Sequence, residues 1–215
     1  MLTNRTFLIY VALMTLVVVA SNFLVQYPLP GSIAGMQLGD LLTWGAFSYP
    51  IAFLVTDLTN RQFGPRTARK VVIAGFAVAI VLSVLVATPR IAIASGSAFL
   101  LGQLLDISVF IRLRMLSWWR APLLGSLFGS MIDTAIFFSV AFAPALAGID
   151  GLFGLEDGSL GFPAPWLGIG PEVPLWISLA TGDFLVKFLA ALLLLAPYRA
   201  LMGRIMPLPP IGARA

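Results

Sequence analysis

The 215-residue chain contains no cysteine and no histidine, and only 10% of its residues are charged. The absence of cysteine excludes disulfides, thiolate metal sites and cysteine nucleophiles. The absence of histidine removes the commonest metal ligand and proton shuttle, so proton chemistry would have to use carboxylates, lysine or tyrosine. Soluble proteins carry about 25% charged residues. Because 60% of this chain is apolar and its mean hydropathy is +1.00, the sequence predicts an integral membrane protein.

Six long apolar stretches predict an all-α, polytopic membrane protein. A helix needs about 20 mostly apolar residues to cross the hydrocarbon core. The predicted spans cover residues 6–26, 41–59, 71–88, 91–111, 121–147 and 173–197. A chain of this length has no room for a separate soluble domain, so we expect residues 1–215 to form one transmembrane domain.

The distribution of Lys and Arg predicts the orientation in the membrane. Alternate loops fall on opposite sides of the membrane, and the three loops on one side carry a single cation, Arg90. One further cation, Lys187, falls inside the sixth span, and all the others lie on the opposite side, which we call the first side. The cations on the first side are Arg5, Arg61, Arg66, Arg69, Lys70, Arg112, Arg114, Arg120, Arg199, Arg204 and Arg214. This asymmetry favours an inner-membrane protein with both termini in the cytoplasm. The alternative that the first stretch is a cleaved signal peptide is weaker, because that stretch is long enough to span.

Charged groups inside the spans are the informative residues, since each costs at least about 2.5 to 3.5 kcal/mol to insert. Helical spacing places them on one face of each of three helices. These faces are Phe99, Gln103, Asp106 and Phe110; Ser126, Ser130, Asp133 and Phe137; and Trp176, Ala180, Asp183 and Lys187. Together they suit a flat polar heterocycle, which stacks on aromatic rings and is recognised at its edge by carboxylates or amides. The candidate substrate-binding residues are therefore Phe99, Gln103, Asp106, Asp133, Trp176, Asp183 and Lys187.

A purely structural interpretation of these groups stays open. Asp183 and Lys187 are four residues apart and could only neutralise each other, while Asp133 could only bond one helix to another. Asp57 near the end of the second span could pair with Arg61 or take a gating or coupling role.

The second span also contains Pro50, which removes a backbone hydrogen bond there. Broken helices often line transporter sites, so Pro50 joins Asp57 as a gating or coupling candidate. On the fifth span, Gly125 and Gly129 beside two serines form a pattern that favours close helix packing. Asp57-Leu-Thr and Asp106-Ile-Ser occur at similar depths and form a faint internal repeat. The longest loop, 148–172, is either a solvated connection or a lid.

No pattern in the sequence predicts an enzyme. A serine hydrolase would need a base beside its nucleophile, and the usual histidine is missing. We find no metal-ligand cluster, phosphate loop or nucleotide fingerprint in the sequence. We therefore expect no catalytic residue, no metal and no cofactor.

Four blocks in order resemble one known family. They are residues 49–64 followed by Ala-Arg-Lys at 68–70, residues 97–110, residues 132–138, and residues 183–187 followed by Pro197. These blocks are similar to the queuosine precursor transporters, also called the vitamin uptake transporter family.

The resemblance implies an importer of the 7-deazaguanines preQ0, preQ1 or both, used to salvage precursors for tRNA modification. With such a substrate, Asp133 or Asp106 would accept from the guanine-like edge, Gln103 would contact the carbonyl side, and Phe99 or Trp176 would stack. Lys187 would keep the neighbouring carboxylate charged.

The implied partners are this small molecule and the lipid bilayer, with no nucleic acid; homo-oligomer formation is left open. Three alternatives remain. The first is a capture subunit for another vitamin-like heterocycle that docks on a separate ATP-driven module, and the second is a membrane assembly protein that transports nothing. The third is an intramembrane hydrolase, of the aspartyl-dyad type at Gly182-Asp183, although no second half of that signature is visible.

Overall fold

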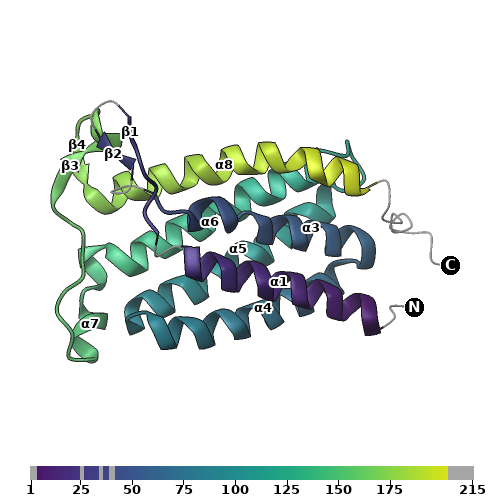
Figure 1. Cartoon of the computed structure of the whole chain (residues 1–215), viewed down its shortest axis with the longest axis horizontal. Coiled ribbons are helices and arrows are strands. Elements are labelled where there is room, and N and C mark those ends of the chain that lie inside the picture. The colour runs from purple at the N-terminus through teal and green to yellow at the C-terminus, as the bar shows by residue number, and fades with distance from the viewer. Residues whose placement is uncertain (1–3, 25–26, 34–35, 39–41, 203–215) are drawn as a thin grey trace.

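The computed structural model describes residues 4–24, 27–33, 36–38 and 42–202. Long helices run roughly along one axis and form a bundle (Figure 1). They are α1 (Asn4–Leu24), α2 (Gly45–Ser48) continued by α3 (Ile51–Phe63), α4 (Pro65–Val86), α5 (Pro89–Leu113), α6 (Arg120–Phe142) and α8 (Leu175–Met202). The end that carries the short strands and α7 (Gly148–Leu152) is called the loop end. The opposite end, where α1 begins and α8 finishes, is called the terminal end.

Each predicted span coincides with a helix of the bundle, with differences at the ends. The second span is divided into α2 and α3 at Pro50, as the missing backbone donor requires. The fifth span was expected to reach residue 147, but α6 ends at Phe142, just before Pro144. The last helix continues through Pro197 to Met202. The predicted positions 25–26 and 41, and the cations Arg204 and Arg214, lie outside the described residues.

Three helices of the described chain are long and apolar enough to cross a membrane by length and composition: α5, α6 and α8. Their outer faces expose large aliphatic side chains, as does α4; Leu193 is 74% exposed and Leu85 is 75% exposed. In water these side chains would be a costly surface, whereas lipid needs no polar cover.

The tight turns between helices have local causes in the sequence. Gly64 links α3 to α4 with a φ of 82°, a conformation that side chains rarely adopt, and Pro65 then opens α4 with its fixed φ. Thr88 caps α5 by accepting a hydrogen bond from the Ile91 amide at 3.4 Å, and Pro89 follows as its first residue. These two connections sit at opposite ends of the bundle and make α3, α4 and α5 antiparallel neighbours (Figure 1).

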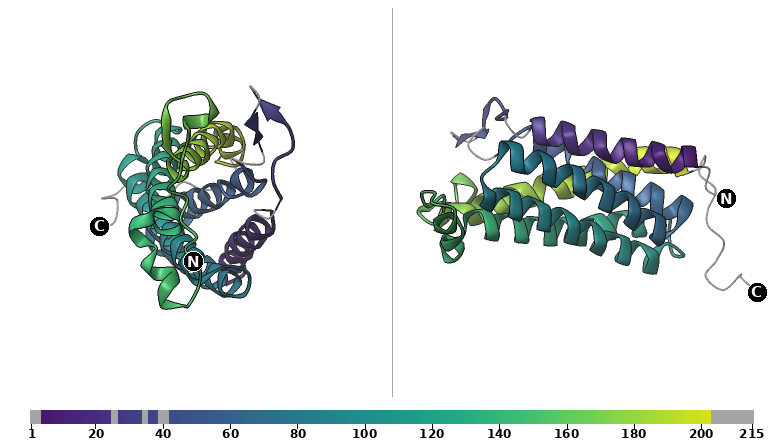
Figure 2. Two further views of the ribbon diagram at one scale, coloured as in Figure 1. Left: turned by 90° about the vertical axis from the view of Figure 1, so that its left-hand side faces the viewer. Right: turned by 90° about the horizontal axis from the view of Figure 1, so that it is seen from below.

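Glycines bring α5 and α6 into backbone contact. A Cβ added at Gly102 would lie 2.9 Å from the Gly129 carbonyl oxygen, and one added at Gly129 would lie 2.9 Å from the Gly102 carbonyl oxygen. A Cβ at Gly125 would overlap the Asp106 carboxylate. The small-residue pattern predicted for close packing is confirmed. This contact holds α5 and α6 together, while α8 packs on α6, and α4 packs on α5 and α1 (Figure 2).

The loop end is fastened by a buried arginine. Arg90 is 1% exposed, and its guanidinium pairs with Asp150 of α7 at 2.7 Å while donating to the Val140 and Ala143 carbonyl oxygens at 2.8 and 2.6 Å. Arg90 therefore holds α7 and the end of α6 together at the loop end, where it is also the single cation predicted for the outer loops. Nearby, hydrogen bonds from Ser159 lower the pKa of the exposed Asp157 carboxyl.

The predicted long loop thus contains ordered elements rather than only a solvated connection. It holds α7 and an antiparallel hairpin of β3 (Pro163–Pro165) and β4 (Glu172–Pro174). A second short hairpin, β1 (Ser32–Ile33) with β2 (Met36–Gln37), lies at the same end (Figure 1).

Candidate functional site

A buried ion cluster joins α6 and α8 near the middle of the bundle. The Lys187 ammonium lies 2.7 Å from an Asp133 carboxylate oxygen and 2.6 Å from one of Asp183. Thr134 accepts from Lys187 at 3.2 Å and donates to Asp183 at 2.7 Å. The side chains of Lys187 and Asp133 are 6% and 5% exposed. Two carboxylates share one ammonium here, so the cluster keeps an excess of negative charge when all three groups are ionised.

Tyr49 completes this cluster from a third direction. Its hydroxyl donates to the second Asp133 oxygen at 2.9 Å, and its ring centre lies 5.2 Å from the Lys187 ammonium. The ring also makes edge contacts with Phe99 and Phe53, with centroids 6.2 and 6.3 Å apart. Tyr49 stands at the break between α2 and α3, directly before Pro50, and this break lets its side chain point inward rather than along a continuous helix.

A cavity of about 350 Å³ opens above the cluster. It is large enough for a small ligand, because ligand pockets begin at about 300 Å³. Ser21, Ala87 and Ile91 line it toward the loop end, while Phe99, Asp133 and Lys187 line its deeper part. Apart from this charged floor, the lining is mostly small or apolar: Val18, Gly45, Ala79, Ala98 and Phe137 with Ser83 and Ser95. The cavity therefore combines a mostly apolar wall with a few converging polar groups, as small-molecule binding sites do.

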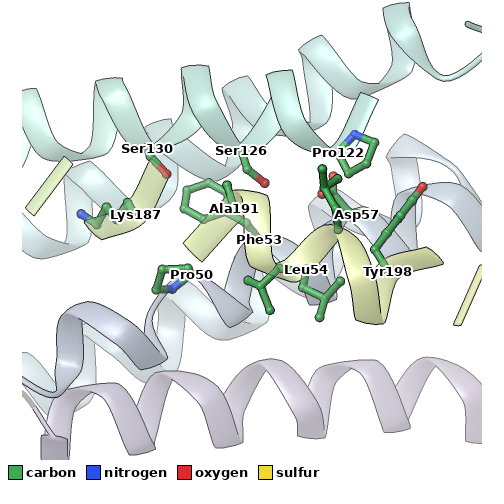
Figure 3. A pocket seen from close by; sticks show the side chains of 12 residues that line it. Pro50, Phe53, Leu54, Asp57, Pro122, Ser126, Ser130, Lys187, Ala191 and Tyr198 are labelled. Carbon is green, nitrogen blue, oxygen red and sulfur yellow. The ribbon is translucent and has the colours of Figure 1, made fainter. Parts of the chain in front are cut away.

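On the terminal side of Lys187 lies a narrow crevice of about 10 Å³, which has room for about one water molecule; Figure 3 shows the side chains that line it. Lys187 lines both this crevice and the large cavity. Ser130, Ser126, Asp57 and Tyr198 follow toward the terminal end (Figure 3). Lys187 thus lies at the boundary between the large cavity and the crevice.

The structure separates the predicted site residues into groups. Phe99, Asp133 and Lys187 line the cavity, and Asp183 is bound to Lys187 beside it. Gln103 lies one turn further along α5, fully buried, where its carbonyl accepts from Thr56 at 2.6 Å and its amide nitrogen has no hydrogen-bond partner.

Three other predicted residues lie elsewhere. Asp106 and Asp57 form a second buried group near the crevice, away from the cavity lining. Trp176 lies half-buried in the first turn of α8, where its backbone amide donates to the Leu160 carbonyl at 3.1 Å, and it is not among the residues that line the cavity. The structure therefore places neither Trp176 nor Asp106 beside Phe99, Asp133 and Lys187 in the cavity lining.

These contacts bear on two of the interpretations left open above. Asp183 and Lys187 do form the pair expected from their spacing, but Lys187 also holds Asp133, so both carboxylates depend on it. Asp57 does not pair with Arg61; Arg61 instead donates to the Tyr198 hydroxyl at 3.3 Å, and one Asp57 oxygen has no partner.

Sequence reasoning missed Tyr49, Thr134 and Thr56 as members of the site. Tyr49 had a usable signal, because it directly precedes the proline that breaks the second span. Thr134 and Thr56 had none, since threonine is common in apolar helices and often bonds only to its own backbone.

Residues 43–201 match the sequence model of a family described as "Putative vitamin uptake transporter". The chain belongs to this family. Together with the apolar helices, this membership identifies a multi-pass membrane protein. The match covers every helix that contributes to the ion cluster and most of the cavity wall, leaving out α1.

Named relatives come from bacteria. The "Queuosine precursor transporter" of Escherichia coli K12 is 42% identical over 148 residues, which cover 59% of this chain and 64% of the relative. The "Probable queuosine precursor transporter" of Haemophilus influenzae is 40% identical over 153 residues, covering 59% and 65%. That of Bacillus subtilis is 27% identical over 199 residues, covering 79% and 75%. The chain thus spans just under two thirds of the length of the first two relatives. No solved structure matches the chain.

Proposed function

We propose that this protein imports a queuosine precursor, the 7-deazaguanine preQ0 or preQ1, through the cavity above Lys187. The observation that carries the proposal is the cavity floor, where aromatic rings and a buried carboxylate meet in a space of about 350 Å³. The names of the relatives support the substrate class. The site contains no arrangement suited to bond cleavage, so we propose transport without catalysis.

The proposed pose follows from hydrogen-bonding capacity. A 7-deazaguanine presents its N1 proton and exocyclic amine along one edge, and a carboxylate accepts both. Asp133 already accepts from Tyr49 and Lys187, but a carboxylate offers about four acceptor positions, so two remain for the substrate. Lys187 gives Asp133 a counter-ion at 2.7 Å, and Phe99 and Tyr49 offer ring edges and faces to the heterocycle. The amide nitrogen of Gln103 has no hydrogen-bond partner. It is a donor for the ring carbonyl of a substrate bound one helical turn deeper than the cavity floor.

We further propose six membrane spans, with α2 and α3 acting as one broken span, and with the terminal end in the cytoplasm. The excess of Lys and Arg at that end supports this orientation. With this orientation, the cavity lies on the outer side of Lys187, as expected for a substrate-accepting state.

The test is the queuosine content of tRNA in bacteria that lack both precursor synthesis and their own importer. The cells receive low external preQ0 or preQ1 together with the wild-type gene, an Asp133→Asn variant or a Glu156→Gln variant. Glu156 is exposed in the loop, so its change is the matched loss of one carboxylate away from the site.

We expect the wild type and Glu156→Gln to restore queuosine equally, and Asp133→Asn to restore less than a tenth as much at equal membrane abundance. Restoration by Asp133→Asn at the wild-type level would remove Asp133 from the site. Failure of the wild type despite its presence in the membrane would overturn the substrate assignment and favour the capture-subunit or assembly alternatives.

A further inference from the structure

Two buried carboxylates on the terminal side of Lys187 have no counter-ion among the described residues. Asp57 of α3 is 1% exposed and Asp106 of α5 is fully buried. One oxygen of Asp57 and both oxygens of Asp106 have no hydrogen-bond partner. Their helices are in contact at the neighbouring positions, where Thr56 donates to Gln103 at 2.6 Å and the Asn60 amide donates to the Ile107 carbonyl oxygen at 3.3 Å. A buried pair of like charges without donors is unstable unless something positive sits between them.

The neighbouring groups do not supply that positive charge. From α3, Arg61 turns to the Tyr198 hydroxyl, and the ion pairs formed between described residues include neither carboxylate. From α6, the neutral Ser126 hydroxyl interacts with Asp57. From α8, Tyr198 is neutral, and Lys187 at the far side of the crevice is already held by two other carboxylates.

The space around the pair favours a proton over a metal ion. The crevice beside Asp57 has room for about one water molecule. On the other side, Gly125 packs so closely that even a Cβ would overlap Asp106. A sodium ion needs several oxygen ligands around it, whereas a proton bound to a carboxylate oxygen needs no cavity.

A narrow crevice lies between this pair and the substrate cavity. The crevice runs from Lys187 past the hydroxyls of Ser130 and Ser126 to Asp57 (Figure 3). Because Lys187 lines both spaces, movement of the floor when a substrate binds Asp133 also changes the entrance to the crevice. The two sites are therefore distinct but share one residue at their boundary.

We propose that the Asp57–Asp106 pair is a proton-coupling site, which binds one proton for each substrate molecule imported; this rests on the proposed function. The proton bonds to a carboxylate oxygen of the pair when the cavity is open at the loop end. The same O–H bond breaks when the bundle opens toward the terminal end, and the proton leaves on that side of the membrane. No electron is transferred, and the pair returns to its starting charge.

The test uses purified protein in liposomes with the membrane potential clamped at zero by potassium and valinomycin, and radiolabelled preQ0 as the probe. With the outside one pH unit more acidic, one proton per substrate predicts accumulation up to about tenfold. Without the pH gradient, or with an inward sodium gradient alone, preQ0 should equilibrate without accumulation. Asp57→Asn and Asp106→Asn should also equilibrate without accumulation under the pH gradient, while they still exchange internal for external preQ0. Glu156→Gln is the matched control and should accumulate preQ0 like the wild type.

Three outcomes would overturn the coupling role. They are wild-type protein that exchanges preQ0 but ignores the pH gradient, accumulation driven by sodium, and gradient-driven accumulation by both neutralised variants. The first result does not depend on any variant folding. If the wild type shows no saturable exchange of preQ0 at equal pH, the proposed function itself fails and the coupling role fails with it. The exchange measurement therefore separates the two failures.

Discussion

The two buried polar groups of this bundle differ in one respect that decides their chemistry. In the cluster of Asp133, Asp183 and Lys187, an ammonium lies within 2.7 Å of both carboxylates. In the pair of Asp57 and Asp106, no cation of the described residues forms an ion pair, and three carboxylate oxygens have no partner. Burial is similar in both places, so burial alone does not reveal the role of a membrane carboxylate. The counter-ion does: Lys187 offsets the charge of the first group, whereas no described residue offsets that of the second.

The largest effect should come from removing the shared cation. Lys187→Met leaves Asp133 and Asp183 buried together without a positive charge, which should lower the free energy of unfolding by about 3 to 5 kcal/mol. Substrate binding should be lost with it. Thermal unfolding of the purified protein in detergent, with and without preQ0, measures both effects.

Two controls interpret that result. Lys70→Met removes an exposed lysine near the start of α4 and should leave the melting temperature almost unchanged. Adding Asp133→Asn and Asp183→Asn to Lys187→Met removes the uncompensated charge and should recover most of the lost stability without recovering binding. If the triple variant is no more stable than the single one, Lys187 stabilises the bundle by packing rather than by charge.

The second prediction compares the same substitution in the two groups. Asp133→Asn removes charged hydrogen bonds to Lys187 and should lower the free energy of unfolding by about 1.5 to 3 kcal/mol. Asp106→Asn removes a carboxylate that has no partner. It should change the free energy of unfolding by less than about 0.5 kcal/mol, or raise it. Thermal unfolding of both variants in one detergent tests this. Equal losses would mean that Asp106 makes a charge-stabilised contact as strong as that of Asp133.

Much of this arrangement was predictable from the sequence, because membrane helices are long apolar stretches in which charged residues are rare. Helical spacing correctly placed Gln103, Asp106 and Asp133 on buried faces. It also predicted the pairing of Asp183 with Lys187, since residues four apart meet on a helix.

The grouping of these residues was not predictable. Spacing along one helix does not tell which helix faces which, so Asp106 and Asp133 were expected at one volume although only Asp133 lines the cavity. Asp57 and Arg61 have the spacing of an ion pair, but Tyr198, 137 positions further along the chain, provides the partner for Arg61. Contacts of that kind depend on the fold and leave no local pattern.

The third prediction concerns the helix contact that holds Asp106 in place. Gly125→Ala puts a methyl group against the Asp106 carboxylate, so it should separate α5 from α6 and lower the free energy of unfolding by about 1 to 3 kcal/mol. Gly148→Ala is the matched control, because a Cβ there meets no atom within 4 Å. Thermal unfolding of the two variants gives the comparison. If both are unchanged, α5 and α6 are less closely packed around the pair than the distances indicate.

The smallest effect should come from Tyr49→Phe, which separates the hydroxyl of Tyr49 from its ring. The variant loses the hydrogen bond to Asp133, worth about 0.5 to 1.5 kcal/mol, but keeps the ring beside Phe99 and Lys187. Affinity for preQ0 should therefore fall by about 2- to 12-fold, and the pH gradient should still drive accumulation, because the hydroxyl belongs to the substrate site and not to the Asp57–Asp106 pair. Binding isotherms and liposome uptake measure the two properties separately. Loss of gradient-driven accumulation with unchanged affinity would show instead that the proton passes through Tyr49, and the two polar groups would then act as one site.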